Sequence, residues 1–100
     1  MAIDLFCYLS MDHDAVKSAL VRIGSKYSDI FGGKFIISPS RDAGCVLKGI
    51  AAEYGVVAES FFMVSLRDKG SANLIPIVSR ILADEFNGLI LILRDNEYRR

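Results

Sequence analysis

The chain is poor in the residues that build metal sites and disulfide scaffolds. Its 100 residues include one histidine, His13, and two cysteines, Cys7 and Cys45, which stand far apart in the sequence. A structural zinc site needs four converging histidine or cysteine ligands, usually in closely spaced pairs, so the sequence predicts none. Residues 12–14, Asp-His-Asp, could contribute to a weak site for a divalent ion, but carboxylates at a helix start are commonly caps, so no metal site is predicted. Both cysteines lie in apolar stretches. This favours buried, reduced and unreactive thiols, with a disulfide between them as the alternative.

The chain also lacks an excess of charge and a long apolar segment. Twelve basic residues balance twelve acidic ones, so no overall field attracts a nucleic acid or an anionic membrane. The longest uninterrupted apolar run, Leu89 to Leu93, is far shorter than the roughly 20 residues of a membrane-spanning helix. Asp4 interrupts the first apolar run and no basic stretch precedes it, which argues against a signal peptide. We therefore expect a cytoplasmic protein whose partner is neither a nucleic acid nor a membrane.

Motifs for catalysis and cofactor binding are missing as well. The sequence contains neither a G-x-S-x-G nucleophile elbow nor a G-x-G-x-x-G dinucleotide motif. The Gly-Gly-Lys segment at 32–34 precedes a predicted strand, whereas a phosphate-binding loop follows a strand and opens a helix. Ser10, Asp12 and His13 are close in sequence, but neighbouring residues at a helix start point in different directions. The sequence predicts a protein that is not an enzyme and needs no cofactor.

The chain is rich in apolar residues, since 52% of its residues are hydrophobic. They suffice for one hydrophobic core, so we expect a single domain over residues 1–100. Four segments rich in β-forming residues predict strands at Ile3 to Leu9, Lys34 to Ser38, Ser60 to Leu66 and Leu89 to Leu93. Between them, apolar stripes predict helices over Val16 to Ile30, Val46 to Tyr54 and Leu74 to Phe86. The first stripe repeats at spacings of four, three, four and three residues, which is typical of one helical face.

The predicted order is therefore β-α-β-α-β-α-β, a four-stranded sheet packed with two main helices and a third, shorter one. This order is typical of an α/β or α+β architecture. If the second helix crosses over the sheet, the strands are mostly parallel with right-handed connections. If it is only a decorated link between the second and third strands, the fold is ferredoxin-like, with an antiparallel sheet and the two main helices on one face. The length of the chain fits both layouts, and a mixed sheet is the favoured interpretation.

The dipeptide Arg-Asp follows three of the predicted strands, at Arg41-Asp42, Arg67-Asp68 and Arg94-Asp95. The simpler interpretation is that each aspartate caps a helix or turn while the arginine balances its charge. The alternatives are a decayed strand–helix repeat and a charged rim that serves a partner.

A partner-binding site is predicted at one rim of the sheet. In both layouts we expect the first and third strands to run parallel, so the residues that follow them meet at one rim. Recognition groups gather in loops at such rims. The candidate residues are Asp12, His13, Asp14, Arg67, Asp68 and Lys69. The other two Arg-Asp pairs would join them in a parallel sheet and lie at the opposite end in a ferredoxin-like one. The competing interpretation is that the candidates are caps and solvated turn charges.

Two segments resemble a known family. They are the apolar first strand, Ile3 to Leu9, and the closing unit Ile81 to Leu91, a helix that runs into Asn-Gly and a final apolar strand. Together with the size and organisation of the chain, they are similar to the small immunity proteins of bacterial contact-dependent growth inhibition and related polymorphic toxin systems. The resemblance implies a cytosolic, non-enzymatic protein that binds a cognate toxin domain and blocks its active site.

The charge of the chain departs from that family in one respect. Immunity proteins against nuclease toxins are often strongly acidic, because they face a basic substrate cleft, whereas this chain is neutral. The neutrality either argues against a nuclease target or confines the acidic groups to one patch. A second hypothesis, from a different class of function, is a small-molecule-sensing or regulatory ferredoxin-like domain that forms a homodimer through an exposed strand edge.

Overall fold

The computed structural model describes residues 4–94, with the side chain of Lys69 excepted. The strands are β1 (Asp4–Leu9), β2 (Phe35–Ile37), β3 (Arg41–Asp42), β4 (Ser60–Leu66) and β5 (Ile90–Arg94). The helices are α1 (His13–Lys26), α2 (Ser28–Phe31), α3 (Cys45–Ala52) and α4 (Ile75–Glu85), with the 3-10 helix η1 (Lys69–Leu74) before α4. Ile3, in the first predicted strand, and Asp95, in the third Arg-Asp pair, lie outside the described residues.

The sheet is antiparallel throughout its described strands. Its order is β2-β4-β1-β5, and the two-residue β3 also pairs with β4. Leu9 at the end of β1 stands opposite Ser60 at the start of β4, and on its other side β1 pairs Leu9 with Ile90 of β5. With β3 set aside, the spatial order is second, third, first and fourth strand, which is the ferredoxin-like layout. The expectation of a mixed sheet is wrong, because α3 does not cross over the sheet and so does not make β2 and β4 parallel.

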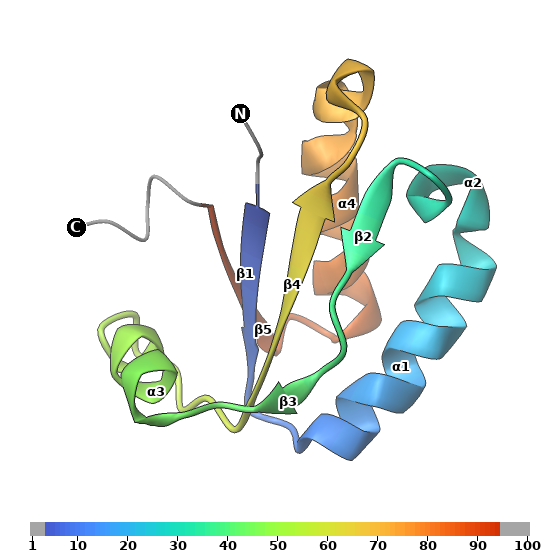
Figure 1. Ribbon diagram of the computed structural model, residues 1–100. Helices are drawn as coiled ribbons and strands as arrows, with labels where there is room; N and C mark the ends of the chain where they lie inside the picture. The colour runs from blue at the N-terminus through green and yellow to red at the C-terminus, as the bar shows by residue number, and fades with distance from the viewer. Residues whose placement is uncertain (1–3, 95–100) are drawn as a thin grey trace.

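The two faces of the sheet are covered unequally (Figure 1). Residues 5, 7 and 9 of β1 face α1 and α4, and they share the larger core with Phe62 and Val64 of β4. Tyr8 and Phe61 face the other way and form a smaller core with Ala51 of α3. Because side chains alternate along a strand, β1 and β4 supply both cores. The small helix α3 lies near one end of its face and leaves the rest of that face without a helix (Figure 1).

The apolar stripes of the two main helices are confirmed. Val16 and Ile23 of α1 and Val78 and Leu82 of α4 are fully buried, while Leu20 is partly buried at the edge of the same core. The last helix ends as predicted, because Asn87 and Gly88 both adopt positive φ angles, 54° and 75°. That left-handed conformation stops an α-helix and turns the chain into β5.

Helix α3 differs from its prediction. Ala51 is buried, but Val46 is 72% exposed and Tyr54 is 41% exposed, so the predicted inward stripe is only partly correct. Cys45, at the start of α3, is exposed, whereas Cys7 is buried in β1 and both thiols are free. Burial in an apolar core raises the pKa of the Cys7 thiol above its ordinary range. The prediction of a buried thiol is confirmed for Cys7 and wrong for Cys45, because the short α3 packs on the sheet through one narrow side.

Within residues 4–94, the helices are all too short or too polar to cross a membrane.

Candidate functional site

The six predicted site residues do not share a rim. Asp12 follows the end of β1, where Leu9 pairs with Ser60, whereas Arg67 follows the end of β4, where Ser65 pairs with Asp4. Because β1 and β4 are antiparallel, their C-terminal ends point in opposite directions. Residues 12–14 therefore lie at one end of the sheet, and Arg67, Asp68 and Lys69 lie at the other, so the expected common rim is wrong.

At the far end, the structure gives Asp68 a local role. Its carboxylate accepts hydrogen bonds from the backbone N–H of Gly70 at 3.1 Å and from the hydroxyl of Ser71 at 3.0 Å. Asp68 thus caps η1, and this confirms the capping interpretation for the second Arg-Asp pair. The hydroxyl of Ser71 therefore supports the capping aspartate and does not cap a helix itself.

A different aspartate joins the residues that follow β1. The Nε2 atom of His13 lies 3.8 Å from Asp42 Oδ1, and its Nδ1 atom lies 3.6 Å from Asp14 Oδ1. The hydroxyl of Ser40 donates a hydrogen bond of 2.8 Å to the backbone carbonyl of His13. The strand β2 runs parallel to β1, because both are antiparallel to β4. The chain that leaves β2 therefore arrives at the end where α1 begins, and the expectation that a ferredoxin-like sheet would place Asp42 at the other end is wrong.

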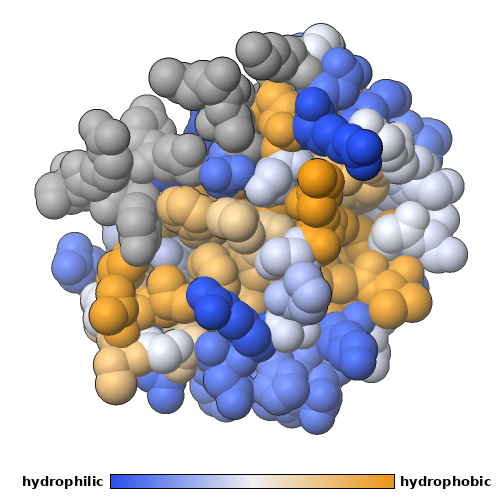
Figure 2. All heavy atoms as spheres, viewed as in Figure 1, coloured by the Kyte–Doolittle hydropathy of each residue, from blue (hydrophilic) through white to orange (hydrophobic). Residues whose placement is uncertain are grey.

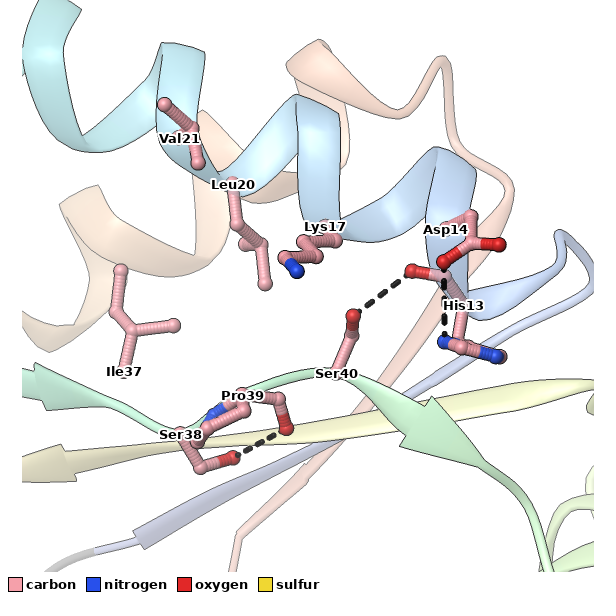
Figure 3. A pocket seen from close by; sticks show the side chains of 9 residues that line it. All are labelled: His13, Asp14, Lys17, Leu20, Val21, Ile37, Ser38, Pro39 and Ser40. Carbon is pink, nitrogen blue, oxygen red and sulfur yellow. Dashed lines mark hydrogen bonds and ion pairs between the residues drawn. The ribbon is translucent and has the colours of Figure 1, made fainter.

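These segments enclose a groove of about 440 Å³ between α1 and the chain that follows β2 (Figure 3). We call it the α1 groove. Apolar side chains from both walls, Leu20 and Val21 on α1 and Ile37 and Pro39 opposite, make up much of its lining. The polar lining is formed by His13, Asp14, Lys17, Ser38 and Ser40. Figure 3 shows Leu20 reaching from α1 toward the segment that carries Pro39 and Ser40.

The groove contains residues that the sequence analysis missed. Ile37, Ser38, Pro39 and Ser40 belong to the exit of a predicted strand and carried no recognisable motif. Val21 did carry a signal, because it is an apolar residue that stands off the buried stripe of α1 and is 70% exposed. An apolar side chain on the outer face of an amphipathic helix is a feature of interaction surfaces when others lie beside it.

Carboxylates are concentrated at the mouth of this groove. The side chains of Asp14 and Asp42 are 83% and 81% exposed, and Asp12 is exposed beside them. Asp12 is also the N-cap of α1, since its Oδ1 accepts hydrogen bonds from the backbone N–H of Asp14 at 2.7 Å and of Ala15 at 3.2 Å. The structure thus places two carboxylates within 4 Å of the His13 imidazole, with the capping Asp12 next to it in the chain, on a protein without net charge.

The arrangement lacks the geometry of nucleophilic catalysis. The hydroxyl of Ser10 donates to the carbonyl of Val57 at 2.7 Å, and the hydroxyl of Ser40 donates to the carbonyl of His13, so neither donates to an imidazole nitrogen. A serine nucleophile needs that contact with its base. Among residues 4–94, no three histidine, cysteine or acidic side chains are placed to hold a metal ion. An apolar groove with a charged mouth is suited to binding a protein surface.

Known proteins similar to this chain agree on one role. The model of the CDI System Immunity Component family matches residues 1–97. The chain is 68% identical over 101 residues to Immunity protein CdiI-2 of Burkholderia pseudomallei (strain 1026b), with all of both chains covered. It is also similar to a chain of the CdiA-CT/CdiI toxin and immunity complex from Burkholderia pseudomallei, with a TM-score of 0.92 and 67% identity over 96% of this chain and 94% of that one. The chain therefore belongs to the immunity components of contact-dependent growth inhibition systems, and it is an immunity protein and not an enzyme.

Proposed function

We propose that this chain binds the toxin domain of its own growth-inhibition system and blocks the active site of that toxin. The support is its 68% identity, over its whole length, to an immunity protein, together with its likeness to a chain of a solved toxin–immunity complex. Inhibition by occlusion requires a rigid surface and no cofactor. The place of action that fits this role is the cytoplasm, where an incoming toxin would be neutralised. The alternative of a small-molecule sensor that forms a homodimer has no support from these relatives.

The toxin-binding surface we propose is the end of the molecule that carries the α1 groove. Of the six predicted residues, Asp12, His13 and Asp14 stay in this proposal and Asp42 joins them, because the fold brings Asp42 within 3.8 Å of His13. Their carboxylates favour a basic surface on the toxin, since complementary charge speeds association and suppresses wrong partners. The apolar walls of the groove provide the water-excluding contact that charged groups alone do not supply.

The first test is binding of the purified cognate toxin domain, measured by isothermal titration calorimetry. The double variant Asp14→Lys, Asp42→Lys reverses two exposed charges and leaves the capping residue Asp12 in place. We expect it to fold normally by circular dichroism and to bind about 10-fold or more weakly. The matched control is Asp29→Lys, which reverses an exposed carboxylate on α2, and its affinity should stay within about 2-fold of wild type.

Protection of growing cells supplies a second measurement. A cell that expresses the toxin domain should survive with the wild-type chain or the Asp29→Lys control, and should be inhibited with the double variant. A wild-type chain that neither binds nor protects would refute the proposed function. A fully protective double variant would leave the function intact and place the interface elsewhere.

A further inference from the structure

The sheet face that α3 leaves open contains a second hollow. Phe6 of β1 and Met63 of β4 are cross-strand partners on this face, and both are half-buried against the smaller core. Two adjoining depressions of about 230 Å³ and 350 Å³ share Arg41, Phe61 and Met63 in their linings. We call them together the sheet-face hollow. Figure 2, which views this face, shows apolar side chains gathered across its middle, with strongly polar ones beside them.

A short ridge separates this hollow from the α1 groove. It consists of Ser38, Pro39 and Ser40. These three residues line the α1 groove on one side and the larger depression of the sheet-face hollow on the other. The ridge is tied down on each side. Ser38 exchanges two hydrogen bonds with the backbone of Met63, both 2.8 Å long, and Ser40 donates to the carbonyl of His13. A ridge held in this way is already ordered before a partner arrives, which lowers the entropy lost on binding.

The first Arg-Asp pair, Arg41-Asp42, places opposite charges on the two sides of this ridge. The guanidinium of Arg41 lies over the ring of Phe61, 5.3 Å from its centroid, on the open sheet face. Asp42, the next residue, faces His13 on the side of α1. Adjacent side chains of a strand point to opposite faces, so the dipeptide in β3 becomes a cation in the sheet-face hollow and an anion at the α1 groove.

We propose that the toxin domain contacts both sides of this ridge, and that the sheet-face hollow is its second anchor pocket beside the α1 groove. The occupant is an apolar side chain of the toxin with a carboxylate beside it. The apolar group would pack on Phe6, Phe61 and Met63, and the carboxylate would pair with Arg41. This inference rests on the proposed function. It extends the interface beyond the α1 groove toward the roughly 800 Å² per partner that a stable complex buries.

Charge and geometry both support this occupant. Arg41 is exposed, and its guanidinium presents a planar set of donors that matches a carboxylate. The cation–π contact with Phe61 favours a position of the guanidinium over this face. A partner that bridges the ridge must carry a cation toward Asp42 and an anion toward Arg41, so the pair sets the orientation of the toxin as well as its affinity.

The test compares two equivalent arginines. Arg41→Glu reverses the charge at the hollow. Arg67→Glu reverses an exposed arginine of the second Arg-Asp pair, which follows the C-terminal end of β4. Neither side chain is buried, so both variants should fold, as circular dichroism would verify. By calorimetry with the purified toxin domain, we expect Arg41→Glu to weaken binding about 30-fold or more. The control should stay within about 2-fold of wild type.

Two further variants probe the apolar part and the carboxylate. Met63→Lys places a charge in the hollow and should weaken binding about 10-fold. Among charge reversals at carboxylates of the toxin, one should restore binding to Arg41→Glu while weakening binding to wild type, which identifies the paired group.

The outcomes separate this proposal from the proposed function. If wild type does not bind the toxin, both fail. If the Asp14, Asp42 double variant loses binding but Arg41→Glu stays within about 2-fold of wild type, the toxin does not occupy the hollow, although the proposed function stands. An equal loss in Arg67→Glu would reveal a general charge effect and overturn the anchor. If wild type is a dimer and Arg41→Glu is a monomer, the hollow binds a second copy of this chain. That outcome would also overturn the proposed anchor.

Discussion

The Oε2 atom of Glu85, at the end of α4, accepts a hydrogen bond of 3.1 Å from the ammonium of Lys26, near the end of α1. The same oxygen accepts a second bond of 3.1 Å from the hydroxyl of Tyr27, and Arg22 lies 3.4 Å from the other carboxylate oxygen. This cluster joins the two main helices on the outside of the core. Since the Glu85 side chain is only 13% exposed, its three partners replace much of the water that would otherwise solvate the carboxylate.

The first prediction is that this cluster makes the stability of the protein depend on pH. The hydrogen bonds from Lys26 and Tyr27 hold the pKa of Glu85 below its ordinary value of 4.5. The stabilisation is therefore present above pH 4.5 and is lost as the pH falls through the lower pKa of the folded state. Wild type should melt at a higher temperature than Glu85→Gln at pH 7, and the difference should shrink toward pH 3. A difference that is the same at both pH values would contradict this explanation.

The second prediction concerns the core under α1. Ile23 is fully buried, so Ile23→Ala should lower the free energy of unfolding by about 2–5 kcal/mol, as for other large-to-small core substitutions. Leu20 is only partly buried at the edge of the α1 groove, so Leu20→Ala should cost less than Ile23→Ala. Urea denaturation measures both. Val21→Ala is the control, since an exposed substitution should change stability by no more than about 0.5 kcal/mol. A larger loss at Leu20 than at Ile23 would be inconsistent with the packing of α1.

The third prediction separates the two thiols. Cys45 is exposed and should react rapidly with a thiol reagent in the native protein, whereas Cys7 should react only on unfolding. Burial raises the pKa of Cys7, which suppresses its reactive thiolate form. Counting modified thiols against time, with and without denaturant, provides the measurement. Fast labelling of a Cys45→Ser variant would show that Cys7 is accessible and would contradict the buried position of β1.

The fourth prediction distinguishes the two roles of Asp12. As the N-cap of α1 it accepts two backbone hydrogen bonds, so Asp12→Ala should cost about 0.5–2 kcal/mol of stability. Asp12→Asn keeps a capping oxygen and removes the charge, so it should fold with nearly the stability of wild type. If the charge also meets the toxin, the asparagine variant should bind more weakly, which titration calorimetry would detect. Wild-type affinity in Asp12→Asn would restrict this residue to its structural role.

Much of the local structure could be predicted from the sequence. The strand at Ser60–Leu66 and the buried stripes of α1 and α4 agree with their predictions, as does the stop at Asn87 and Gly88. These features depend on residues a few positions apart, whose spacing and turn chemistry act locally. The short α3 was the least regular of the predicted helices, and there local pattern did not indicate which side would be buried.

The direction of the strands, by contrast, was decided by tertiary structure. Alternation in β1 and β4 indicates two faces but not which neighbour each strand takes or whether the pair is parallel, because pairing joins segments far apart in the chain. The antiparallel pairing of β1 with β4 separated Asp12 from Arg67, and the parallel course of β2 and β1 brought Asp42 to His13. The sequence by itself thus determined the four main strands, the main helices, the neutral composition and the family resemblance, but not the two-residue strand β3. The tertiary structure alone decided which charges became neighbours, since two side chains meet only where the pairing of their strands brings them together.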